Sequence, residues 1–145
     1  MTNGDFANGE TEWHVTVSAG VGISHMIVGG QLCVSLPANA SASVGYPVDL
    51  SATFALAAGT RYQLSYQVSS TSQAINFEAK VGGATAPFTN VVDFMAEAAG
   101  PPNQPRTNSH PFTPAVASSS TGVAFTITTA APSTVCVGNV WVSAL

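Results

Sequence analysis

The chain has 145 residues, of which 46% are hydrophobic and 7% charged, and its formal net charge at pH 7 is −4. Soluble domains carry about 25% charged residues, so hydroxyl groups must supply much of this surface, and Ser and Thr together fill 31 positions. Lys and Arg number only 3, too few to neutralise a phosphate track or an anionic lipid surface. The apolar runs are too short to span a bilayer. Nucleic-acid and membrane partners are therefore excluded.

Apolar and polar residues alternate in short runs separated by Gly, Pro and Ser, a pattern that predicts β-strands with one buried face. The predicted strands are Glu12–Ala19, Ser24–Val28, Gln31–Leu36, Val44–Leu50, Arg61–Ser69, Ile75–Val81, Val123–Thr128 and Val135–Val142. Many short strands at this spacing predict an all-β fold, a two-sheet β-sandwich or jelly roll. No internal repeat or linker interrupts the pattern, so we expect one domain over residues 1–145.

Glycines and prolines mark the expected irregularities. Gly29-Gly30 predicts a two-residue hairpin, and Gly138-Asn139 shifts the alternation as a β-bulge does. Pro47 places its strand at a sheet edge or beside a bulge. No long stretch keeps a helical period, but Ala52–Ala58 and Phe94–Ala99 are each expected to allow one helical turn.

The apolar side of the clearest alternations should form the core between the sheets. We expect this core to include Trp13, Tyr62, Leu64, Tyr66, Phe77 and Phe125.

Cys33 and Cys136 lie in similar apolar contexts, Leu-Cys-Val and Val-Cys-Val, 103 positions apart. They are either two buried free thiols or one disulfide that closes nearly the whole domain and implies an oxidising compartment. No zinc pattern fits their spacing.

The sequence does not predict an enzyme. Seven carboxylates are present, but no spacing singles out the facing pair that glycoside hydrolysis needs. The three histidines show no metal-binding spacing, and no nucleophile elbow or phosphate loop occurs.

A binding surface is better supported. The polar rows Gln63-Ser65-Gln67 and Asn76-Glu78-Lys80 are expected side by side on one sheet face, extended by Thr126 and Thr128. Amides and hydroxyls of this kind hydrogen-bond sugar hydroxyls. The alternative interpretation is an ordinary solvated face.

Several motifs together resemble the family 4 and related carbohydrate-binding modules. They are Asn3–Gly9 followed by Trp13, Gly30–Pro37, Gly59–Tyr66, Ala79–Gly82, Ala86–Phe88 and Thr134–Val140. The resemblance covers essentially the whole chain. It implies a jelly-roll sandwich, a disulfide between Cys33 and Cys136, and a cleft across one sheet that takes single soluble glucan chains.

The family's ligand contacts are mostly changed in this chain. Its cleft tyrosines fall at Thr16 and Phe88, a cleft arginine at Glu78, asparagines near Ser51 and Ala84, and glutamines at Gly122 and Thr126. Together with the polar rows, the predicted ligand-binding residues are Thr16, Ser51, Gln67, Asn76, Glu78, Phe88 and Thr126.

The resemblance also implies a structural calcium, but the family's acidic ligands fall at Ala7 and Gly138, which leaves Asp5 as a weak candidate. Calcium needs several oxygen ligands with carboxylate charge. We therefore expect no cofactor.

The function that these observations favour is a non-catalytic carbohydrate-binding module. We expect a monomeric module, tethered to the catalytic domain of a secreted polysaccharide-degrading enzyme, with a polysaccharide such as a β-glucan as partner. Met1 is not followed by a signal-peptide pattern, so a secreted protein would be represented here by its mature part. The alternatives are a structural β-sandwich spacer with a degenerate cleft and a small lyase or hydrolase.

Overall fold

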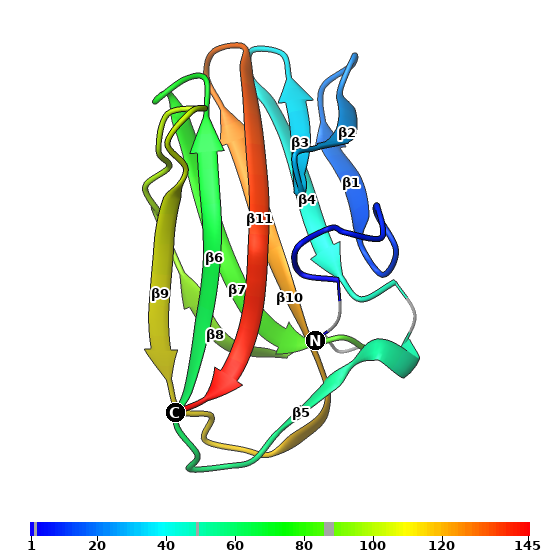
Figure 1. Ribbon diagram of the computed structural model, residues 1–145, viewed down its shortest axis with the longest axis vertical. Coiled ribbons are helices and arrows are strands. Elements are labelled where there is room, and N and C mark those ends of the chain that lie inside the picture. Colours follow the sequence, from blue (N-terminus) through cyan, green and yellow to red (C-terminus); the bar gives the residue numbers. More distant parts are fainter. Residues whose placement is uncertain (2, 49, 86–88) are drawn as a thin grey trace.

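Two antiparallel β-sheets pack face to face in the computed structural model, which describes residues 1, 3–48, 50–85 and 89–145 (Figure 1). Sheet A has the strand order β1-β4-β10-β7-β8, with β5 also paired to β10, and sheet B has the order β2-β3-β11-β6-β9. The strands are β1 (His14–Ala19), β2 (Ser24–Val28), β3 (Gln31–Leu36), β4 (Ala40–Tyr46), β5 (Phe54–Leu56), β6 (Tyr62–Ser70), β7 (Ile75–Gly83), β8 (Asn90–Phe94), β9 (Arg106–Phe112), β10 (Ser118–Thr129) and β11 (Ser133–Ala144). The predicted all-β jelly-roll sandwich is confirmed. None of the described helices is long and apolar enough to cross a membrane.

The core lies between the sheets and is built around aromatic rings. Phe125 is in the middle of this cluster, with its ring centroid 5.0 Å from that of Tyr66 and 5.4 Å from that of Phe77. Trp13 packs 4.9 Å from Phe6 at one end. Five of the six predicted core residues are buried, and Tyr62 is half-buried. Burial of these rings removes a large apolar area from water, which is the main stabilising contribution to such a fold.

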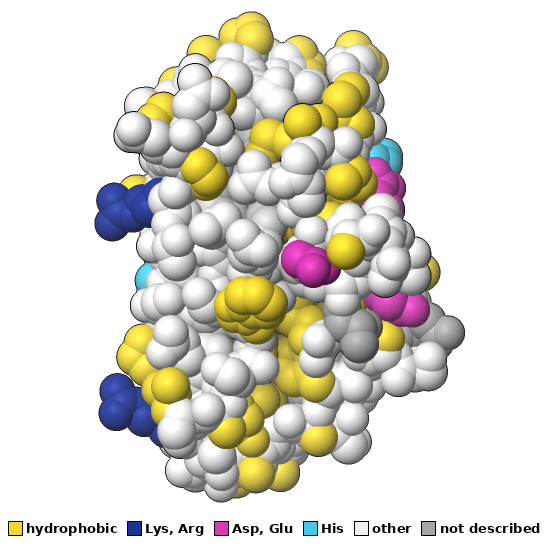
Figure 2. Space-filling model, in the orientation of Figure 1, with side chains coloured by type: hydrophobic (Ala, Val, Ile, Leu, Met, Phe, Trp, Pro, Cys, Tyr) yellow, Lys and Arg dark blue, Asp and Glu magenta, His cyan; other side chains and the backbone are white. Residues whose placement is uncertain are grey.

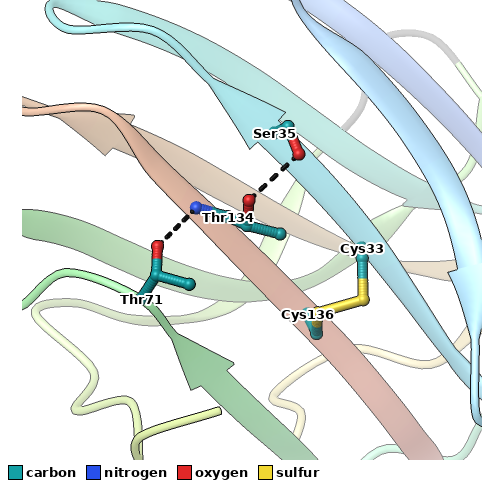
Figure 3. Close-up of a disulfide and its surroundings, with 5 residues drawn as sticks. All are labelled: Cys33, Ser35, Thr71, Thr134 and Cys136. Carbon is teal, nitrogen blue, oxygen red and sulfur yellow. Dashed lines mark hydrogen bonds between the residues drawn. A yellow bond between two sulfur atoms is a disulfide. The ribbon is translucent and has the colours of Figure 1, made fainter.

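Cys33 and Cys136 form a disulfide, as one of the two sequence interpretations predicted (Figure 3). The two residues are direct cross-strand partners on β3 and β11. Beside them the Ser35 and Thr134 hydroxyls are hydrogen-bonded at 3.0 Å, and the Thr134 N–H donates to Thr71 Oγ1 at 2.9 Å. The centre of sheet B is therefore held by covalent as well as polar cross-strand contacts.

The predicted hairpin and bulge are both confirmed. Gly29 and Gly30 have φ values of 56° and 76°, the left-handed conformation that a type I′ turn requires at both central positions. The pairing of β11 with β6 changes register between Gly138 and Trp141.

The expectation for Pro47 was wrong. Strand β4 ends at Tyr46 and lies between β1 and β10, so it is not an edge strand, and its pairings show no register shift next to Tyr46 that would mark a bulge. Pro47 follows the end of the strand, where its missing N–H removes no ladder hydrogen bond. Beyond it Val48 and Leu50 are more than half exposed, at 59% and 53%.

The two expected helical turns were also misplaced. The first region holds the short 3-10 turn η1 (Leu50–Ala52) and then β5, which pairs with β10. In the second, β8 ends at Phe94, after which the Glu97 N–H donates to Phe77 O and the Gly100 N–H donates to Val68 O. Carbonyl groups of β7 and β6 thus accept these hydrogen bonds, so a local helical turn has no advantage here.

Candidate functional site

A row of polar residues crosses the outer face of sheet A. The strand register pairs Thr16 with Ser43, Ser43 with Thr126, and Thr126 with Glu78. Cross-strand partners share a face of the sheet, and the chain neighbours Val44, Phe77 and Phe125 point into the core instead. Four adjacent strands, β1, β4, β10 and β7, therefore present one hydroxyl or carboxylate each to solvent.

Parallel rows enlarge this polar face along β10 and β7. The pairs are Thr128 with Asn76, Thr126 with Glu78, Ala124 with Lys80, and Gly122 with Gly82. Partners two residues apart along a strand are separated by about 7 Å, so the four pairs span about 20 Å. We call the outward face of these rows on β1, β4, β10 and β7 the sheet A face.

Small residues at one end of the sheet A face leave it hollow. The hollow has a volume of about 170 Å³ and is lined by Lys80, Gly82, Gly83, Asn90, Gly122 and Ala124. Beside Ala124, Gly45 provides a place for an imidazole ring: a Cβ atom on Gly45 would lie 2.5 Å from His14 Cε1. A larger residue at position 45 would force the His14 ring to move.

Lys80 is held between two carboxylates on this face. Its Nζ atom lies 3.4 Å from Glu78 Oε2 and 3.4 Å from Asp93 Oδ2, and Asn76 Nδ2 donates to Glu78 Oε1 at 3.3 Å. Partial burial disfavours the charged amine, but the nearby Asp93 and Glu78 carboxylates outweigh it and raise the pKa of Lys80 above its ordinary value. The cluster keeps one excess negative charge and a fixed arrangement of donors and acceptors.

The structure brings together four of the seven predicted ligand-binding residues: Thr16, Asn76, Glu78 and Thr126 lie on the sheet A face. Ser51 is exposed on η1, outside these rows. Phe88 lies outside the described residues. Whether any of them contacts a ligand stays a prediction.

The placement of Gln67 was wrong. The rows Gln63-Ser65-Gln67 and Asn76-Glu78-Lys80 were expected side by side, but β6 belongs to sheet B and β7 to sheet A. Gln67 lies on the opposite side of the sandwich, where its Oε1 accepts a hydrogen bond of 2.7 Å from Asn139 Nδ2. Consecutive strands usually lie next to each other in one sheet, but the connection from β6 to β7 passes from sheet B to sheet A.

Sequence reasoning missed His14, Ser43 and Asp93 as members of this face. Ser43 had a usable signal, because Ser41 and Ser43 alternate with the buried Ala42 and Val44. Asp93 had none, since β8 was not predicted and its pairing with Lys80 depends on the fold.

The calcium candidate Asp5 has one carboxylate oxygen engaged within its own loop, where Oδ1 accepts the Ala7 N–H at 3.2 Å. Among the described residues, no group of three or more His, Cys, Asp or Glu side chains is arranged to hold a metal ion. Calcium needs several oxygen ligands with carboxylate charge, and the absence of a bound cofactor stays a prediction.

No protein-family model matches the chain, and no curated protein matches it. Solved structures do match over nearly the whole chain. A family 4 carbohydrate-binding module (CBM4) superposes with a TM-score of 0.74 at 23% identity, covering 97% of this chain and 99% of the other. The chain has the fold of a CBM4 module.

Two further structures have the same sandwich as this CBM4-like chain. The N-terminal cellulose-binding domain of β-1,4-glucanase C from Cellulomonas fimi matches with a TM-score of 0.62 at 20% identity, covering 99% of this chain and 93% of the other. TmCBM61, solved with β-1,4-galactotriose, matches with a TM-score of 0.64 at 11% identity, covering 100% and 97%.

Proposed function

We propose that this chain is a non-catalytic carbohydrate-binding module whose sheet A face binds a single chain of a neutral polysaccharide, a β-glucan or a similar polymer. The observation that carries the proposal is the continuous row Thr16–Ser43–Thr126–Glu78, which lies next to a hollow floored by glycine and alanine. Small residues let the backbone of a ligand approach, while hydroxyls and carboxylates hydrogen-bond its hydroxyl groups. Similar solved structures include a cellulose-binding domain and a module complexed with a galactotriose.

The charge on this face favours a neutral ligand over an acidic one. Glu78 and Asp93 together outnumber Lys80, whose amine is already paired with both. The carboxylates of an acidic polysaccharide would be repelled by this excess negative charge, and Lys80 is already paired. A neutral chain meets no such cost.

In the wider proposal, the module tethers a secreted polysaccharide-degrading enzyme to its substrate. Tethering raises the local concentration of a linked catalytic domain on the polymer. The disulfide supports an oxidising compartment, as expected for secretion. A structural spacer is the alternative outcome of the tests below.

The direct test fills the hollow. Ala124 faces outward and is half-buried, so Ala124→Tyr should place a phenol in the hollow without disturbing the core. Affinity electrophoresis against hydroxyethyl cellulose, soluble xylan and galactomannan should show retardation of the wild type. For the polymer that binds the sheet A face, we expect the variant to lose about tenfold or more in affinity.

Ala58→Tyr is the matched control, because Ala58 is exposed in the turn before β6, outside the sheet A face. It should leave affinity unchanged. Equal retardation of wild type and Ala124→Tyr would contradict binding on this face. No retardation of the wild type by any of the polymers would favour the spacer. Release of reducing sugars from any of them would show an enzyme instead.

A further inference from the structure

The outer face of sheet B carries an exposed tryptophan that the sheet A proposal does not use. Trp141 follows the bulge in β11 and is 53% exposed, whereas Trp13 in the core is 3% exposed. Its neighbours Val140 and Val142 point inward, so the indole points away from the sandwich. Within the described residues the indole makes no ring contact. Tryptophan stabilises a fold most when its large ring is buried, so an indole exposed to solvent in the middle of a sheet is unusual.

Hydroxyl and amide groups surround the indole in register. Trp141 pairs with Ser65, which pairs with Ser109, and the Ser65 and Ser109 hydroxyls are hydrogen-bonded at 3.1 Å. One row away, Ser143 pairs with Gln63. On the other side, Gln67 Oε1 accepts the Asn139 amide. These cross-strand partners stand on the same face of the sheet as Trp141.

The strand that carries Trp141 and the two strands paired with it contribute no charged side chain to this face. Strands β3, β11 and β6 contain no Asp, Glu, Lys or Arg. Figure 2 shows a compact hydrophobic patch over β11 near the middle of this face, with dark blue cations at the β9 side, magenta acids toward the opposite side and one magenta acid close to the patch; most of the remaining surface around it is polar and uncharged. These three strands offer a charged partner no complementary ion, and a neutral polyhydroxylated partner needs none.

We propose that Trp141, with Gln63, Ser65 and Ser109 around it, is a second carbohydrate-binding platform, on the side of the sandwich opposite the sheet A face. The apolar C–H face of a pyranose ring stacks on the indole, and the ring hydroxyls exchange hydrogen bonds with the serine hydroxyls and the Gln63 amide. The ligand class is a neutral polysaccharide. The platform goes beyond the proposed function of the sheet A face and does not depend on it.

Fluorescence can follow this platform by itself, because the chain has two tryptophans and only Trp141 is open to solvent. A neutral quencher such as acrylamide should therefore act mainly on Trp141. Titration with hydroxyethyl cellulose, soluble xylan or galactomannan should protect Trp141 from quenching and shift its emission to the blue with at least one polymer. Wild-type emission unchanged by all three polymers would overturn the proposal.

Affinity electrophoresis of variants gives the second readout. Trp141→Ala should weaken binding of the polymer that protects Trp141 by about 5- to 30-fold at this platform, and Trp141→Phe should recover part of it. Because the indole points outward, both variants should melt like the wild type, which a thermal scan checks.

Ala124→Tyr separates this proposal from the previous one. We expect this variant to keep the full fluorescence response, and Trp141→Ala to keep the binding that Ala124→Tyr removes. If Ala124→Tyr abolishes the fluorescence response, the platform proposal fails while the sheet A proposal stands. If Trp141→Ala abolishes all binding and Ala124→Tyr has no effect, the sheet A proposal fails and the platform stands.

Concentration-dependent dimerisation lost in Trp141→Ala would identify a second copy of the chain as the occupant and overturn the proposal.

Discussion

Phe125 and Thr126 are neighbours in the chain with opposite environments. Phe125 is fully buried among the rings of Trp13, Tyr66 and Phe77, whereas Thr126 is the central hydroxyl of the row on the sheet A face. Strand geometry sends successive side chains to opposite faces. One residue therefore serves stability and the next is free to serve binding.

Phe125→Ala should lower the free energy of unfolding by about 3–5 kcal/mol, since it removes a buried ring and leaves a cavity between the sheets. Urea denaturation measures this loss. Thr126→Ala is the matched control on the same strand and should change stability by less than about 1 kcal/mol. A comparably small loss in Phe125→Ala would contradict the observed facing of β10.

Tyr66 is the ionisable group that the core affects most. Burial, and then the negative charge of Glu97, raise its pKa well above the ordinary value of 10.0. The native state therefore keeps the phenol proton under conditions in which the unfolded chain loses it. This contribution to stability is complete below pH 10.0 and is lost as the pH rises above that value.

The expected result is an alkaline loss of stability of about 1.4 kcal/mol per pH unit above the ordinary tyrosine pKa. Tyr66→Phe should remove this slope, because phenylalanine has no proton to lose. Tyr62→Phe, on the same strand and half-buried, should retain it. Urea denaturation at several alkaline pH values measures the slopes, and equal slopes in wild type and Tyr66→Phe would show that Tyr66 is not responsible.

At the scale of strands, the disulfide joins β3 to β11 across 103 positions of the chain. A cross-link of this length restricts the unfolded chain strongly, and on the chain-entropy model it contributes about 4–5 kcal/mol. Reduction should therefore lower the urea midpoint substantially. The urea midpoint of the double variant Cys33→Ala/Cys136→Ala should equal that of the reduced wild type and should not change when reductant is added. A reduced wild type as stable as the oxidised one would contradict this prediction.

Strands that bury one continuous apolar face could be predicted from the sequence. Strands without such a face could not be predicted. Tyr62 to Ser70 alternates cleanly and forms β6. Strand β9, Arg106–Phe112, buries only Asn108 and Phe112 fully, so its sequence lacks a hydrophobic period. Its existence depends on the pairing with β6, which is a long-range contact.

For the candidate site, the sequence predicted which residues share the face of one strand. It did not predict which strands lie next to each other. Glu78 and Asn76 share a strand, so their common face followed from alternation. Grouping Gln67 with them failed, because the alternation of a strand does not say which of two sheets the strand joins. Sheet membership is decided by the whole sandwich.

At the scale of the molecule, both proposed binding faces lie on the outside of the sandwich, with the core between them. The sheet A face is hollowed and carries the Glu78–Lys80–Asp93 cluster, whereas the sheet B platform is uncharged and centred on one indole. The two faces would contact a neutral polymer by different means. The first depends mainly on hydrogen bonds, and the second mainly on ring stacking.

The net charge of −4 and pI near 5.0 give a final prediction about ligand charge. Affinity for a neutral glucan should change by less than about twofold when ionic strength is raised tenfold, since salt screens only charge–charge interactions. Polygalacturonate, an acidic polymer, should bind more weakly than the neutral glucan at low salt, because its carboxylates meet Glu78 and Asp93 with Lys80 already paired. Lys80→Met should weaken polygalacturonate binding further by exposing both carboxylates. Tight binding of polygalacturonate that salt weakens steeply would show that a cationic surface, not either of these two faces, recognises the polymer.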